Sequence, residues 1–344
     1  MRVTALAGGI GAARFLRGVR AALPDADITV IGNTGDDITL HGLRICPDLD
    51  TVMYTLGGAI SAERGWGREG ETFVVAEELA AYGVGPAWFG LGDRDLATHL
   101  VRTQMLDAGH PLADVTRAIC DRWQPGVRLL PMTNDRVETH VVITDESGQR
   151  AVHFQEWWLR LRAAVPAQAI VALRAESATP APGVLDAIGQ ADVVLFPPSN
   201  PVVSIGTILA IPGIRDAVAS TAAPVVGVSP IIGGAAVRGM ADACLTAIGV
   251  ETSAQAVGAH YGGRGRAGRG RAGRGRAGQG SSDAVTPPTD GQAAPTGLLD
   301  GWLVDTADAA AVVPGAVVAS RPLLMTDLPA TEAIVRAALE LAGV

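Results

Sequence analysis

Runs of apolar, β-branched residues alternate with segments of helical spacing along most of the chain. Residues 2–7, 28–32, 169–173, 192–196 and 224–228 have the length and composition of buried strands. The stretches predicted to be helical lie at about 9–23, 51–56, 71–82, 93–106, 112–123 and 331–341. This alternation predicts the α/β class, with a Rossmann-like, doubly wound and mostly parallel sheet.

One segment, residues 128–160, is richer in strands than the rest. Strands are predicted at 128–132 and 137–143, and a third at 151–158 after the Ser147-Gly148 turn. We interpret this segment as a small β-rich insertion. The surrounding residues, 1–261 and 298–344, are predicted to form a single α/β domain.

Residues 262–297 differ in composition from both flanks. The first half repeats glycine, arginine and alanine without an acidic residue, and the second half is rich in Ser, Thr, Pro and Gly. Such a segment buries little apolar area, so we expect it to be disordered. An RNA or anion tether is one interpretation. A tolerated repeat expansion in a surface loop is the interpretation we favour, because long loops add little to the cost of folding.

The charged residues exclude several kinds of chemistry. None of the 344 residues is lysine, so all 27 basic residues are arginines. A Walker-type phosphate loop and a Schiff-base mechanism both need a lysine and are therefore excluded. The net charge of −8 argues against a nucleic-acid partner. The three cysteines lack metal-ligand spacing, which indicates a reducing cytoplasm and no structural zinc.

No membrane partner is expected either. Residues 217–237 carry no charge and are long enough to span a bilayer, but Pro224, Pro230 and several glycines divide them into shorter pieces. The apolar run before Gly8 is too short for a signal peptide. We therefore expect a cytoplasmic location.

The most distinctive polar stretch, residues 33–51, follows the second predicted strand. It places four acids within fifteen residues, and these are Asp36, Asp37, Asp48 and Asp50. Carboxylates crowded at the end of a parallel strand repel one another unless a divalent cation or a metal-bound phosphate neutralises them. The alternative is a solvated acidic loop whose aspartates form turns and cap helices.

A glycine turn, residues 8–11, joins the first predicted strand to the first helix. Free N–H groups at a helix start form an anion site, and glycine lets a phosphate approach the backbone. The match to the dinucleotide fingerprint is partial, because Arg14 stands where the third glycine belongs. Arg14 is either a phosphate contact or a solvated first-turn residue. Similar polar loops follow Gly32, Phe196 and Val228, and such loops converge on one sheet edge in doubly wound folds.

Further candidates lie between residues 66 and 99. Asp93 is either a helix cap or, with Arg94, a contact for substrate hydroxyls and phosphate. His99 is either a base or an ordinary helical side chain. Trp66, in a glycine-rich loop, either stacks on a planar ligand or anchors the loop by packing.

Six motifs in order resemble one known family. They are Ala7-Gly-Gly-Ile-Gly11, Asn33-Thr-Gly-Asp-Asp37, Cys46-Pro-Asp-Leu-Asp-Thr51, Leu91-Gly-Asp-Arg-Asp95, Ser199-Asn-Pro201 with Ser204-Ile-Gly206, and Ser229-Pro-Ile-Ile-Gly233. Together they resemble the 2-phospho-L-lactate (or phosphoenolpyruvate) transferase family of coenzyme F-420 biosynthesis. The resemblance covers nearly the whole chain except about 262–297.

The resemblance implies an activity and its partners. A phosphoenolpyruvyl or 2-phospho-L-lactyl group would pass from a GTP-derived diphosphate donor to the terminal ribityl hydroxyl of the deazaflavin Fo, with release of GMP. It also implies Mg²⁺ and a homodimer. Asp50 is similar to the family residue that contacts the deazaflavin. Archaeal members have a lysine directly before the Leu91 motif, and this chain has Gly90 there.

These implications assign roles to the candidate residues. The expected metal ligands are Asp36, Asp37, Asp48 and Asp50, with Asp50 and Asp37 as the catalytic residues. The expected deazaflavin contacts are Asp50, Asp93 and Arg94. The expected nucleotide and phosphate contacts are Gly8, Gly9, Gly11, Arg14, Asn33, Thr34, Ser199, Asn200, Ser204 and Gly206.

The rival hypothesis is a dinucleotide-dependent oxidoreductase, or a regulatory nucleotide-binding protein, that keeps the fold without transfer chemistry. It predicts that an acid at the end of the second strand, Asp36 or Asp37, binds a ribose. An RNA-associated protein working through the Arg-Gly repeat is a third possibility.

Overall fold

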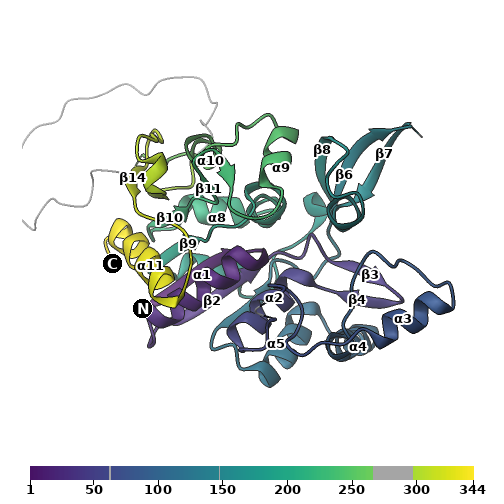
Figure 1. Cartoon of the computed structure of the whole chain (residues 1–344). Helices are drawn as coiled ribbons and strands as arrows, with labels where there is room; N and C mark the ends of the chain where they lie inside the picture. Colours follow the sequence, from purple (N-terminus) through teal and green to yellow (C-terminus); the bar gives the residue numbers. More distant parts are fainter. Residues whose placement is uncertain (62, 147, 266–296) are drawn as a thin grey trace, which may run out of the picture.

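A seven-stranded parallel sheet forms the centre of the fold (Figure 1). The structure, a computed structural model, describes residues 1–61, 63–146, 148–265 and 297–344. The strands, in sheet order, are β14 (Val317–Ser320), β13 (Gly301–Val304), β10 (Val225–Val228), β9 (Val193–Phe196), β1 (Arg2–Ala7), β2 (Asp27–Gly32) and β5 (Arg128–Pro131). Every neighbouring pair is parallel. The predicted fold class is confirmed.

Helices cover both faces of this sheet (Figure 1). On one face lie α1 (Gly9–Ala22), α2 (Pro47–Leu56), α5 (Leu112–Trp123) and α11 (Leu328–Ala342). On the other lie α6 (Val184–Gly189), α7 (Thr207–Leu209), α8 (Ile214–Ser220), α9 (Ala241–Ala247) and α10 (Ala254–Tyr261). Val30 packs into the first core and Ile31 into the second. Burial on both faces explains why the strands are continuously apolar.

The β-rich insertion has different bounds from those predicted. It is a three-stranded antiparallel sheet of β7 (Gly148–His153), β6 (Glu138–Asp145) and β8 (Ala167–Leu173). β5 belongs to the main sheet instead, because it pairs with β2. The predicted strand over 151–158 was wrong beyond His153, since η1 (Glu156–Arg160) is a π-helix in which Trp157 is fully buried.

The acidic stretch folds into a hairpin and a helix. The hairpin, β3 (Ile38–Leu40) with β4 (Leu43–Ile45), was not predicted. The helix α2 begins at Pro47, four residues before the predicted start, and proline favours this first helical position. Asp48 and Asp50 therefore lie in its first turn.

The remaining elements are short or lie outside the two helical layers. They are α3 (Val74–Ala81), α4 (Asp93–Asp107), the 3-10 turns η2 (Ala175–Ser177) and η4 (Thr306–Asp308), the π-helix η3 (Pro201–Gly206), and the hairpin β11 (Ile231–Ile232) with β12 (Ala235–Ala236). In Figure 1, α3 and α4 lie at the lower right, below the β6–β8 sheet.

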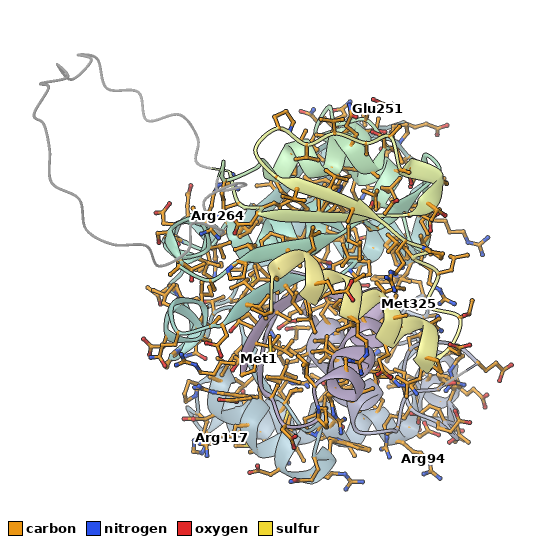
Figure 2. All side chains as sticks on the ribbon, turned by 90° about the vertical axis from the view of Figure 1, so that its left-hand side faces the viewer. Met1, Arg94, Arg117, Glu251, Arg264 and Met325 are labelled. Carbon is orange, nitrogen blue, oxygen red and sulfur yellow. The ribbon has the colours of Figure 1, made fainter. Side chains whose placement is uncertain are left out.

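Most of the predicted Arg/Gly-rich insertion, residues 266–296, lies outside the described residues. Its first residues belong to the fold. Gly263 pairs with Leu299, and the side chain of Arg264 is buried against Asp300 at 3.0 Å (Arg264 Nη1 to Asp300 Oδ2). Arg264 is also labelled in Figure 2. The first arginine of the repeat is therefore a structural residue.

The uncharged run 217–237 is divided among α8, β10 and the β11–β12 hairpin. In the part of the chain that the structure describes, no single helix is long and apolar enough to cross a membrane. One helix pair, 201–209 with 214–220, has suitable length and composition but is bent by 87°.

Candidate active site

The sheet has its topological switch point between β1 and β9. The chain continues from β1 to β2 on one side, whereas β9 leads to β10 on the other. In open α/β sheets, ligands bind in the crevice beyond the carboxyl ends of the strands at this point. A cavity of about 790 Å³ lies here, a size suited to small-molecule substrates. Its lining comes from the β1–α1 turn, Asp36, Ile45, α2 and α4, and from parts of residues 64–67, 88–90, 154–159, 198–204, 229–241 and 323–326.

Close packing explains two of the glycines in the β1–α1 turn. A Cβ atom on Gly8 would lie 2.5 Å from the Cβ of Ser204 and 2.8 Å from Oδ2 of Asp48. A Cβ atom on Gly11 would lie 2.4 Å from the backbone oxygen of Pro198. The hydroxyl of Ser199 donates to the carbonyl of Gly8 at 2.9 Å. The turn after β1 and the loop after β9 are thus held together, and no larger residue fits between them.

Asp48 joins α2 to the same turn. Its Oδ1 accepts a hydrogen bond from the N–H of Gly9 at 2.8 Å, and its Oδ2 accepts one from Nδ2 of Asn33 at 2.9 Å. Burial raises the pKa of Asp48 to about 6, even though these two hydrogen bonds favour the carboxylate.

Asp36 is the acid that lacks a full set of partners. Its Oδ1 is buried and, among the described residues, has no hydrogen-bond donor. Burial raises the pKa of Asp36 well above its usual range, and the charges of Asp48 and Asp37 raise it further. Asp36 and Asp48 both line the cavity, so two mutually repelling carboxylates face the space beside the glycine turn.

Asp37, by contrast, is neutralised away from the cavity. Its Oδ2 accepts from Nη2 of Arg44 at 2.9 Å and from Sγ of Cys46 at 3.0 Å. Burial raises the pKa of Asp37 to about 6, and the charge of Arg44 opposes the shift. Asp37 does not line the cavity, so this geometry does not favour the expected catalytic and metal-binding roles.

Asp50 lines the cavity but is paired beneath it with Arg102. The guanidinium donates to both carboxylate oxygens, with 3.0 Å between Nη1 and Oδ2. Burial raises the pKa of Asp50, and the charges of Arg102 and His99 oppose the shift. Because its charge is already matched, Asp50 is a weak candidate for a metal ligand and a good acceptor for a substrate hydroxyl.

The pair continues into a buried polar network on α4. Nδ1 of His99 lies 3.1 Å from Nη1 of Arg102, and Nε2 of His99 lies 3.3 Å from Oδ2 of Asp95. Because arginine only donates, Nδ1 of His99 accepts here. The hydroxyl of Tyr54 donates to Oδ1 of Asp95 at 2.6 Å. Burial would raise the pKa of Asp95, but the hydrogen bond and charge of His99 and the bond from Tyr54 outweigh it and lower the pKa.

Sequence reasoning missed Arg102, and a signal for it existed. Asp95, His99 and Arg102 have the spacing i, i+4, i+7, which places them on one face of a helix. A polar stripe of this kind on a helix with a buried face indicates a partner, here Asp50.

The structure brings most of the predicted site residues to the cavity. Those in the lining are Gly8, Gly9, Gly11, Arg14, Asp36, Asp48, Asp50, Ser199, Asn200 and Ser204. Asn33, Thr34, Asp37 and Gly206 lie outside the lining. Asn33 instead supports it, because its amide also donates to the carbonyl of Val203 at 3.2 Å.

Asp93 and Arg94 are not part of the lining. Asp93 accepts hydrogen bonds from Oγ1 of Thr72 at 2.6 Å and from the N–H groups of Val74 and Val75 at 3.0 Å. The hydrogen bond from Thr72 is the main cause of its lowered pKa. Arg94 is exposed and lies at the margin of the molecule in Figure 2. The predicted cap of the helix after Gly92 was wrong, because Asp93 is the first residue of α4 and its carboxylate instead accepts from the first N–H groups of α3. The structure does not support either residue as a deazaflavin contact.

Aromatic side chains form another part of the lining. Trp66, Trp88, Phe89, Phe154 and Trp158 come from three separate segments. The ring of Trp66 is held by the guanidinium of Arg64, 5.5 Å from its centroid, and remains 46% exposed. A Cβ atom on Gly90 would lie 3.3 Å from this ring, so the glycine makes room for the tryptophan.

The donor set fits a metal shared with a phosphate. Among the residues described, no group of three or more His, Cys, Asp and Glu side chains is placed to hold a metal alone. Mg²⁺ commonly binds one or two carboxylates together with substrate phosphates and water. Asp36, with its orphaned buried oxygen, and Asp48 beside the glycine turn match that pattern.

Comparisons with known proteins extend over nearly the whole chain. The family model for the 2-phospho-L-lactate transferase CofD matches residues 3–312. The chain is 62% identical over 346 residues to the phosphoenolpyruvate transferase of Streptomyces coelicolor (99% of this chain, 98% of the relative). It is 55% identical over 355 residues to that of Mycolicibacterium smegmatis (100% and 99%). A solved structure from Bacillus halodurans, a member of the UPF0052 family, has the same fold, with a TM-score of 0.57 at 17% identity and coverage of 98% and 99%.

Proposed function

Because the chain belongs to the 2-phospho-L-lactate transferase (CofD) family, and so to a family of transferases, we propose that it transfers a phosphoenolpyruvyl group. The donor is a GTP-derived diphosphate, the acceptor is the ribityl hydroxyl of Fo, and GMP leaves. The choice of enolpyruvate over lactate follows the relatives, which are phosphoenolpyruvate transferases at 62% and 55% identity. The reaction would serve coenzyme F-420 biosynthesis.

One observation carries the proposal: the Asp36–Asp48 pair faces the cavity beside the Gly8–Gly11 turn. Transfer at phosphorus needs in-line positioning and neutralised charge more than it needs covalent catalysis. Mg²⁺ bound by this pair would neutralise charge on the donor's diphosphate. The N–H groups of α1 that follow Gly9 would bind the same diphosphate, because they have no intrahelical partners there, whereas the N–H of Gly9 is bonded to Asp48.

The other polar residues of the lining have roles consistent with this chemistry. Ser204 offers a hydroxyl near the diphosphate, whereas Ser199 uses its hydroxyl to fix the Gly8 turn. Asn200 fixes their loop by accepting from the N–H groups of Val202 and Val203 at 2.9 and 3.2 Å. Asp50 would accept a hydrogen bond from the attacking hydroxyl, since Arg102 stabilises its carboxylate.

The acceptor would lie against the aromatic part of the lining. A deazaflavin is planar and aromatic, and such rings stack on tryptophan. Trp66 is exposed to the cavity and held in place by Arg64, which makes it the stacking residue we favour. It would take over the acceptor contact at the position where Gly90 offers no side chain.

The test is mass spectrometry of the products formed from Fo and competing donors. The purified protein is incubated with Mg²⁺, Fo and guanylyl diphosphates that carry enolpyruvate, lactate or glycerate. We expect the enolpyruvyl adduct of Fo and one GMP per adduct. Binding of NAD(H) without any adduct would support the oxidoreductase rival and overturn the proposal.

A further inference from the structure

Two arginines from distant parts of the chain line the cavity near the glycine turn. Arg14 lies in the second turn of α1, and Arg238 follows the β11–β12 hairpin. A Cβ atom on Gly65 would lie 3.3 Å from Nη1 of Arg238 and 4.0 Å from Cγ1 of Ile10. Arg238 therefore reaches the loop that lies over the Gly8–Gly11 turn.

Neither guanidinium is paired with another residue that the structure describes. Among the described ranges, Arg14 and Arg238 have no ion pair and no side-chain hydrogen bond. Burial lowers the pKa of Arg14, and the charges of Arg238 and then Arg17 lower it further. Two like charges that repel across a cavity without a counter-charge indicate that an anion binds between them.

The other arginines near the cavity are already engaged. Arg44 pairs with Asp37 and Arg102 with Asp50. Arg64 donates to the carbonyl of Arg68 at 2.7 Å and lies over Trp66. The cavity is thus lined, from three different segments of the chain, by two arginines and one acid that have no ion-pair partner among the described residues, and these are Arg14, Arg238 and Asp36.

We propose that Arg14 and Arg238 bind the outer anionic end of the donor, which is its β-phosphate or the carboxylate that the phosphate carries. This inference rests on the proposed function for the identity of the donor. A guanidinium offers a planar pair of N–H groups that matches either anion. With a cation at Asp36 and Asp48 and two arginines on other segments of the lining, the cavity would fix the orientation in which the donor binds.

The experiment measures GDP and GMP binding by calorimetry for the wild type, Arg238→Gln, Arg238→Lys and Arg17→Gln. Arg17 is exposed on α1 and does not line the cavity, so its variant removes a nearby charge without removing the contact. Donor KM is measured alongside. We expect Arg238→Gln to weaken GDP binding, or to raise the donor KM, by about 10- to 100-fold, because a charge-assisted hydrogen bond is lost. Arg238→Lys should lose less, since the charge remains.

The outcomes separate the two anions. Weaker GDP binding with unchanged GMP binding assigns the arginines to the β-phosphate. Unchanged GDP binding with a raised donor KM assigns them to the carboxylate. The proposal is overturned if Arg238→Gln matches the wild type in all three measurements, if GDP and GMP weaken equally, or if Arg17→Gln has the same effect. The GDP and GMP measurements need no turnover, so they remain informative even if no adduct of Fo is formed.

Discussion

Replacing Arg102 by methionine should strongly destabilise the protein. The Arg102 side chain is 3% exposed and the Asp50 side chain 6%, so the variant leaves a buried carboxylate without its counter-charge. Removing one partner of a buried pair costs about 3–5 kcal/mol. An independent upper limit on this loss comes from the alternative in which Asp50 takes up a proton in the folded variant. To neutralise a carboxyl whose unfolded pKa is about 4 costs about 1.4 kcal/mol per pH unit, or about 4 kcal/mol at pH 7.

Because this protonation cost grows with pH, the loss of stability in Arg102→Met should depend on pH. In the variant, the folded pKa of Asp50 would lie far above its unfolded value, so the protein is least affected below about pH 4 and loses stability as the pH rises. Because burial already raises the pKa of Asp50 in the wild type, these costs are upper limits on the difference in unfolding free energy from wild type, which should be at most about 4 kcal/mol at pH 7 and at most about 1.4 kcal/mol at pH 5. Urea denaturation at both pH values measures it.

Two further variants complete the test. The double variant Asp50→Asn/Arg102→Met should be more stable at pH 7 than Arg102→Met alone, because no buried charge remains. Arg117→Met is the control, since Arg117 pairs with Asp114 at the surface, where ion pairs contribute about 0–1 kcal/mol. A loss below about 1 kcal/mol for Arg102→Met, or a loss independent of pH, would refute the reasoning.

Four other predictions concern the site and the insertion. Gly11→Ala should destabilise the protein by about 1–3 kcal/mol and reduce activity, because its Cβ would lie 2.4 Å from the backbone oxygen of Pro198. Gly189→Ala is the control, since its Cβ would have no atom within 4 Å, and it should change neither quantity in the same denaturation and rate assays. Because the pKa of Asp48 is raised to about 6, this residue should stabilise the ligand-free fold below about pH 4, and the contribution should be lost as the pH rises through 6. Mg²⁺ affinity should rise over the same range. Denaturation and calorimetry on wild type and Asp48→Asn measure both trends, and the two proteins would show the same pH dependence if the shift is absent. Asp50→Asn should lower turnover by about 100-fold with Fo as acceptor, and a wild-type rate would remove its catalytic role. Deleting residues 266–296 should leave activity and melting temperature unchanged, because Gly263 and Leu299 already pair across the ends, and a lost activity would revive the RNA hypothesis.

The homodimer implied by the family resemblance remains a prediction. Light scattering of the purified protein measures the mass in solution directly. A mass of about twice 35.2 kDa would support the dimer, and the monomer mass would contradict it.

The sequence predicted the inner strands β1, β2, β9 and β10 well because they are buried on both faces. Continuous apolar runs such as Val193–Phe196 are distinctive for that reason. The sequence also grouped residues 169–173 with these buried strands, but β8 is partly exposed and belongs to the antiparallel insertion. It predicted the β3–β4 hairpin poorly, since each strand has three residues and only Leu40 and Ile45 are buried there. Trp157 and Trp158 were assigned to a strand by composition, but strand pairing ends at His153 and a π-helix follows.

For the site, sequence position alone does not separate acids that face the cavity from those that are neutralised behind it. Asp36 and Asp37 are adjacent, yet only Asp36 lines the cavity, because Arg44 on the neighbouring hairpin strand pairs with Asp37. Asp48 and Asp50 both line the cavity, but only Asp50 is paired with an arginine, since Arg102 arrives from α4, about fifty residues further along the chain. These pairings depend on the tertiary fold.

The most direct test of the account is a crystal structure with GDP, Mg²⁺ and Fo. We expect the diphosphate at the Gly8–Gly11 turn, the metal between it and the carboxylates of Asp36 and Asp48, and the deazaflavin ring against Trp66 with its ribityl chain near Asp50. A diphosphate bound elsewhere, or a metal that contacts neither Asp36 nor Asp48, would contradict it.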